Sequence, residues 1–224
     1  MPVKKLFLLL LLSASISLSG CATVGEINSG FRKLDRMWAL EYQRTEDLYR
    51  HRVIDAPYDI VYSQVKKTFL DLSMPLIVRD YENGILLAEN EAPKPLTKEE
   101  WLQVKAEESP KTKAEAGWLF SLPDNPSDYI ITVKATLLGK GDKTFVLLDY
   151  KMKNPKYEEM GFEPSEYAPP LAVQFGSVKF WNTLEQGLSN VSLPAPRERA
   201  KSERYAHLNG GQDSVSSVAS LMNY

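Results

Sequence analysis

Two consecutive segments of strictly alternating side chains constrain the fold more than any other feature of this sequence. In residues 129–138, Tyr129, Ile131, Val133, Ala135 and Leu137 take one face, and residues 144–152 alternate in the same way. This period of two predicts β-strands with one buried face. The Gly139-Lys140-Gly141-Asp142 sequence between them predicts a hairpin turn, because a phosphate-binding loop would open a helix instead.

The flanking segments predict the rest of an α+β domain. Residues 50–54 form a short strand candidate, a helix begins at Pro57, and two further strands, 76–80 and 85–90, flank the turn-forming Asn83-Gly84 pair. A long helix covers residues 171–188. Each element has a single apolar side, so we expect an antiparallel sheet with the helix after the first strand and the C-terminal helix on one face.

The N-terminus has the layout of an export signal. Lys4 and Lys5 precede an apolar run at residues 6–12, and the run is followed by Leu18-Ser19-Gly20-Cys21. These four residues resemble the lipobox of bacterial lipoproteins. The resemblance implies cleavage between Gly20 and Cys21, a diacylglycerol on the Cys21 thiol, and N-acylation. The only expected cofactor-like group is this covalent lipid. Ala22, the residue after it, implies the outer membrane, with the domain facing the periplasm.

An amphipathic helix is expected directly after the lipid. Val24, Ile27, Phe31, Leu34 and Trp38 follow one another in steps of three, four, three and four residues, which places them on one helical stripe. The stripe either packs on the protein's own domain, or serves as a spacer, or lies on the bilayer or a partner. Trp38 is therefore a candidate partner contact.

The chain divides into a signal peptide (1–20), a lipidated N-terminus with its helix (21–49), an α+β domain (50–192) and a C-terminal tail (193–224) in which we expect little fixed structure. Residues 92–128 form an insertion in the domain, with a capping box at Thr97–Glu100 and a short helix through Glu107. Aromatic side chains of the insertion and of the proline-rich stretch 154–170 are candidate anchors for a partner, unless they fold back on the sheet: Trp101, Trp118, Tyr157, Phe162 and Tyr167.

Composition and motifs disfavour catalysis and nucleic-acid binding. Removal of the signal peptide leaves 25 basic and 29 acidic residues, too acidic a balance to attract a polyanion. The two histidines, His51 and His207, are far apart in sequence, and no residue has the surroundings of a catalytic nucleophile. We therefore predict no catalytic residues and no metal site.

The layout of the domain resembles the helix-grip arrangement, in which a C-terminal helix lies in the curve of an antiparallel sheet. Among lipoproteins, it is similar to the helix-grip domains in the C subunit of the outer-membrane β-barrel assembly machinery. The shared features are the strand that ends in Ala56-Pro57, the following helix and the Asp80–Gly84 hairpin. The resemblance implies a non-enzymatic module that binds a protein of the envelope. The alternative is a carrier of a lipid or another small apolar ligand, in a groove between the sheet and the C-terminal helix lined by Phe175, Val178 and Trp181.

Overall fold

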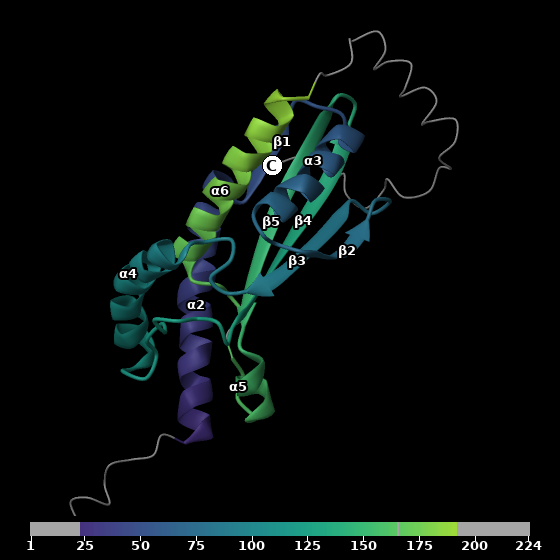
Figure 1. Ribbon diagram of the computed structural model, residues 1–224. Coiled ribbons are helices and arrows are strands. Elements are labelled where there is room, and N and C mark those ends of the chain that lie inside the picture. Colours follow the sequence, from purple (N-terminus) through teal and green to yellow (C-terminus); the bar gives the residue numbers. More distant parts are fainter. Residues whose placement is uncertain (1–22, 165, 192–224) are drawn as a thin grey trace, which may run out of the picture.

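The computed structural model describes residues 23–164 and 166–191. The predicted signal peptide, the Gly20–Cys21 cleavage and lipidation site, and the tail 193–224 lie outside the described residues. One five-stranded antiparallel sheet in the order β1-β5-β4-β3-β2 forms the centre of the molecule (Figure 1). Its strands are β1 (His51–Ile54), β2 (Leu76–Asp80), β3 (Ile85–Glu91), β4 (Ile130–Lys140) and β5 (Lys143–Lys153).

The β4–β5 hairpin confirms the alternation predicted from the sequence. The strands pair from Lys140 with Lys143 at the turn to Ile130 with Lys153 at the far end. The apolar side chains of one face are buried on both strands: Ile131, Val133, Ala135, Leu137, Val146, Leu148, Tyr150 and Met152. The predicted Asp80–Gly84 hairpin is also present, between β2 and β3, with Gly84 at a positive φ of 66°.

Two helices, α3 (Tyr58–Asp71) and α6 (Pro170–Ser189), lie on the same side of the sheet (Figure 1). They contact each other as well as the strands, and the Phe69 and Phe180 ring centroids are 5.2 Å apart in the core between them. The predicted fold class is therefore confirmed. It is an α+β, helix-grip-like domain whose long C-terminal helix packs on one face of an antiparallel sheet.

The buried stripe of α6 differs from the predicted one. Trp181 is fully buried, Phe175 is half-buried, and Val178 is 40% exposed, so its assignment to a groove lining is wrong. The small residues Gly176 and Ser177 occupy the buried positions instead. A Cβ atom at position 176 would lie 3.3 Å from the Tyr150 ring, so the glycine lets the helix approach β5 closely. The cavity left beside the N-terminal half of α6 measures only about 20 Å³.

The amphipathic segment forms α2 (Val24–Tyr49), which packs along α6, α4 and the edge strand β1. Leu34, Trp38 and Tyr42 are all buried, so the stripe covers the protein's own domain. Trp38 is 3% exposed, so its assignment as an exposed partner contact is wrong. The stripe extends to Tyr42, whose hydroxyl donates a hydrogen bond to the carbonyl of Ala168 over 3.1 Å.

The predicted insertion contributes to the core instead of lying on the surface. Its capping box is present, but α4 (Lys98–Ala116) continues past Glu107 and through Pro110. Trp101 is 1% exposed and donates a hydrogen bond from Nε1 to the carbonyl of Pro123 over 2.9 Å, so its assignment as a partner anchor is also wrong. Val104, one turn further along, is buried beside it in the same core.

Two valines of α6 test the burial pattern. Val173 is 4% exposed, whereas Val178 is 40% exposed. Both residues lie on α6, so replacement by alanine changes the helix propensity equally at the two positions. We expect Val173→Ala to lower the free energy of unfolding by about 2 kcal/mol, because it removes buried methyl groups and leaves a cavity. Val178→Ala should change it by less than about 0.5 kcal/mol. Urea unfolding measures both, and equal losses would contradict the assigned faces.

A charged contact between α4 and α6 predicts a pH dependence. Lys179 Nζ and the backbone N–H of Thr97 each lie 2.6 Å from Glu100 Oε2. Burial alone would raise the pKa of Glu100, but these two donors hold that pKa below its ordinary value. A carboxylate whose pKa is lowered by folding stabilises the folded protein at pH values above its pKa in the unfolded chain, which is about 4.3. This stabilisation is lost as the pH falls through the lower pKa that the carboxylate has in the folded protein.

We therefore expect Glu100→Gln to be less stable than the unmodified protein at pH 7, with the difference shrinking as the pH falls below about 5. Urea unfolding at a series of pH values measures the difference. Glu115→Gln, at the exposed end of the same helix, is the control and should cost less than about 0.5 kcal/mol at pH 7. A loss for Glu100→Gln that stays constant down to pH 3 would exclude the ionised carboxylate as its cause.

Candidate functional site

An apolar cavity of about 260 Å³ lies between α2 and the end of the sheet. The N-terminal half of α2 forms one wall, and the segment after α4 forms the second with Leu119, Phe120 and Leu122. The sheet contributes Tyr129 and Met152, from the start of β4 and the end of β5. The stretch after β5 closes the cavity with Tyr157, Phe162, Pro164 and Tyr167.

The helical period explains the wall that α2 provides. Ile27, Phe31, Leu34 and Trp38 repeat every three or four residues and therefore line the cavity one above the other. Gly30 lies within this buried face, and a Cβ atom added there would come within 2.2 Å of the Phe120 ring. The missing side chain at position 30 thus allows α2 and the segment after α4 to meet.

Seven of the sixteen residues that line the cavity are aromatic. The Phe31 ring centroid lies 5.2 Å from that of Phe120, in an edge-to-face arrangement, and 5.7 Å from that of Tyr157. Tyr157 in turn lies 6.1 Å from Phe162. Such edge-to-face pairs are favoured over stacked sandwiches, so the rings hold one another in place.

The polar atoms at the cavity are few and uncharged. Of the described residues that line it, none is acidic or basic. Burial raises the pKa of the Tyr129 phenol, and the nearby Tyr157 hydroxyl, 3.5 Å away, raises it further. The phenol is therefore neutral at physiological pH. A site of this composition can hold an apolar group.

Hydrogen bonds hold the stretch after β5 against α2. That stretch opens with the short helix α5 (Pro155–Glu159), which was not predicted. Asn28 Oδ1 accepts a hydrogen bond from the backbone N–H of Glu163 over 2.9 Å, and Arg32 forms an exposed ion pair with the Glu163 carboxylate. These contacts position Phe162 and Pro164 at the cavity.

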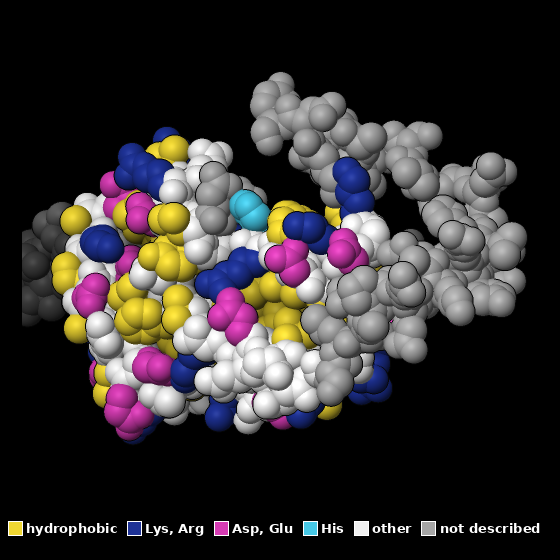
Figure 2. All heavy atoms as spheres, turned by 90° about the horizontal axis from the view of Figure 1, so that it is seen from above, with side chains coloured by type: hydrophobic (Ala, Val, Ile, Leu, Met, Phe, Trp, Pro, Cys, Tyr) yellow, Lys and Arg dark blue, Asp and Glu magenta, His cyan; other side chains and the backbone are white. Residues whose placement is uncertain are grey.

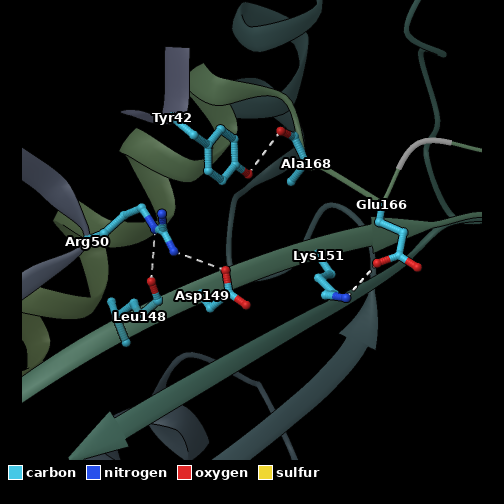
Figure 3. A network of polar contacts seen from close by, with 7 residues as sticks. All are labelled: Tyr42, Arg50, Leu148, Asp149, Lys151, Glu166 and Ala168. Carbon is cyan, nitrogen blue, oxygen red and sulfur yellow. Dashed lines mark hydrogen bonds and ion pairs between the residues drawn. The ribbon is translucent and has the colours of Figure 1, made fainter. Parts of the chain in front are cut away.

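A second group of polar contacts holds the segment before α6 (Figure 3). Lys151 Nζ lies 2.6 Å from Glu166 Oε2, and Tyr42 binds the Ala168 carbonyl two residues further on. Arg50 binds both the Leu148 carbonyl and the Asp149 carboxylate, each over 3.1 Å, at the junction of α2 and β1. The network fixes the backbone on both sides of Tyr167, which lines the cavity.

Three of the predicted partner anchors therefore come together in the structure. Tyr157, Phe162 and Tyr167 all line the cavity, and Trp38 forms part of its wall, whereas Trp101 belongs to the core. The aromatics folded back towards the sheet, which was one of the two alternatives. Sequence reasoning missed Gly30, Phe120, Tyr129 and Met152 as site residues. A glycine on the buried face of a long helix is the signal that could have drawn attention to Gly30.

The outer surface is mixed in character. On the face shown in Figure 2, Lys and Arg side chains stand beside Asp and Glu side chains, with apolar side chains between them. In the part of the chain that the structure describes, no group of three or more His, Cys, Asp or Glu side chains is placed to hold a metal ion. Nor, within residues 23–164 and 166–191, does any helix combine the length and the apolar character of a membrane span.

No protein-family model fits the chain, and no curated protein is significantly similar to it in sequence.

Two glycines of α2 test how the cavity wall is built. A side chain at Gly25 would meet only an ordinary contact, with Thr23 at 3.9 Å, whereas one at Gly30 would displace the Phe120 ring. We expect Gly25→Ala to raise the free energy of unfolding by up to about 1 kcal/mol, because alanine favours the helix. Gly30→Ala should give no such gain, because the ring must move.

Chemical denaturation of both variants measures the difference. Combining Gly30→Ala with Phe120→Leu, which removes the ring edge, should recover part of the gain through a coupling between the two positions. Equal gains from the two single glycine variants would show that α2 does not approach the segment after α4 as described.

Proposed function

We propose that this chain is a non-enzymatic lipoprotein, anchored in the outer membrane through acylated Cys21 and facing the periplasm, that binds an apolar group in the cavity beside α2. The anchor and the location rest on the sequence of residues 1–22. The binding role rests on one observation, the neutral aromatic cavity, because a pocket of this kind gains free energy by taking apolar surface out of water.

The size of the cavity bounds what it can accept. Its volume of about 260 Å³ is below the roughly 300–1,000 Å³ of pockets for drug-sized ligands, and above the roughly 150 Å³ that holds a benzene ring. One aromatic or branched aliphatic side chain fits this space, as does a short stretch of hydrocarbon. A large cofactor does not.

The favoured source of that group is a protein of the envelope. Interfaces commonly concentrate their binding free energy in one apolar side chain that enters a pocket, surrounded by contacts that exclude water. Leu119 and Tyr167 line the cavity and are partly exposed, so they are placed to make those surrounding contacts. The resemblance to the helix-grip lipoprotein of the barrel-assembly machinery supports a partner of this class.

The second source is an acyl chain or another small apolar molecule. It is favoured by the neutral lining and by the proximity of the cavity to the start of α2, three residues after the proposed lipid site. This site replaces the predicted groove between the sheet and α6, where Trp181 and the small residues leave almost no space.

Photocrosslinking in intact cells tests the proposal. A photoreactive amino acid placed at Phe162 or Tyr167, which line the cavity, should trap one specific protein, or a lipid-sized mass if the occupant is a small molecule. The same amino acid at Lys140 is the matched control, since Lys140 is exposed at the β4–β5 turn, far from the cavity along both strands. Adducts that are the same at all three positions, or none at the cavity positions, would count against binding there.

Native mass spectrometry distinguishes the two sources. The mature chain, made with Cys21→Ser so that it carries no anchor, should retain a bound small molecule through purification if the cavity is a carrier site. An empty chain together with a protein crosslink assigns the cavity to a partner's side chain.

A further inference from the structure

Four large apolar side chains are exposed at the end of the molecule where α2 begins. We call them the N-terminal tip: Val24, Trp118, Leu119 and Met160, which are 51%, 79%, 48% and 55% exposed. In Figure 1 the start of α2 and α5 lie at the end away from the β4–β5 turn, and the segment after α4 lies beside the N-terminal half of α2. The rings of Phe31, Phe120 and Tyr157 join these three segments around the cavity.

The exposure of Trp118 has no counterpart among the other described tryptophans. Trp38, Trp101 and Trp181 are 3%, 1% and 0% exposed. Exposed apolar side chains that gather at one end of a molecule mark a surface that another phase or molecule covers. Tryptophan in particular favours the boundary between lipid and water, because its ring is apolar and its N–H can still find a polar partner.

The chain between the tip and the proposed lipid site is very short. Val24 is three positions after Cys21, and a fully extended chain spans at most about 3.5 Å per residue. If Cys21 carries lipid, the first turn of α2 therefore lies within about 10 Å of the membrane surface. Because α2 is packed on the domain along its length, the whole tip is held at that surface.

We propose that the N-terminal tip docks on the lipid bilayer, with Trp118 and Leu119 in the interfacial region. This inference rests on the proposed anchor at Cys21. It adds that the folded domain itself touches the membrane in a fixed orientation, with the cavity at its membrane-facing end. Leu119 belongs to both the tip and the cavity wall, so the two sites are continuous.

The charges around the tip indicate the type of contact. Glu115, Glu158 and Glu159 are exposed close in sequence to the tip residues, beside Lys113 and Lys156. This mixture gives anionic lipids no electrostatic advantage. Contact through apolar side chains should therefore occur on zwitterionic membranes and be insensitive to salt.

Quenching of Trp118 fluorescence tests the proposal. The chain has a single cysteine, so mature protein comprising residues 21–224 can be coupled through Cys21 to a maleimide-headgroup lipid in phosphatidylcholine vesicles. With brominated acyl chains in the vesicles, we expect a loss of emission, and with ordinary chains a blue shift. Trp118→Phe should abolish both effects, because the remaining described tryptophans are buried.

Unchanged Trp118 fluorescence would contradict the proposal. Suppose that coupling is complete, that brominated lipid leaves the Trp118 emission unchanged, and that acrylamide in the water still quenches Trp118 fully. The tip then does not touch the bilayer. It would then be free for an envelope protein to cover. The chemical coupling supplies the anchor, so this experiment does not depend on lipidation of Cys21 in the cell. The result would therefore contradict membrane docking of the tip. It would not bear on lipidation of Cys21 or on ligand binding in the cavity.

Discussion

The burial of one face of α2 against the domain is the interaction on which the other features depend. Leu34, Trp38 and Tyr42 carry this contact, and the Tyr42 hydroxyl adds a hydrogen bond to the segment before α6. Trp181 completes it by donating a hydrogen bond from its indole Nε1 to the Tyr49 carbonyl over 2.7 Å. Without this packing the cavity would lack one wall, and the chain leaving the proposed lipid site would be a loose tether.

The fold was predictable because its signals are local. Alternation in β4 and β5, the Asn83-Gly84 turn and the apolar side of α3 each act within a few residues, and together they specify the sheet and the helices on its face. The face of α6 was harder to predict. The buried positions there include Gly176 and Ser177, whose small size allows close packing but gives no hydrophobic signal.

The candidate site could be predicted only in part, because it is assembled from distant segments. Tyr157, Phe162 and Tyr167 were recognisable as unusual aromatics, but the contact of Tyr157 with Phe31 joins residues more than a hundred positions apart. Trp101 illustrates the opposite error. Its polar surroundings in the sequence suggested exposure, whereas Trp101 lies on the buried face of α4, a helix that also contains a proline.

The cavity, the tip and the position of Cys21 lead to one account of function. We propose that the neutral aromatic pocket binds apolar surface, that α2 connects this pocket to the N-terminus, and that a lipid on Cys21 holds both beside the bilayer.

The most direct test of the account is the mass of the N-terminal peptide from protein purified out of the membranes of its native host. The account predicts a peptide that begins at Cys21 and carries a diacylglycerol and an additional acyl chain. A peptide that still contains residues 1–20, or a Cys21 without fatty acid, would contradict it.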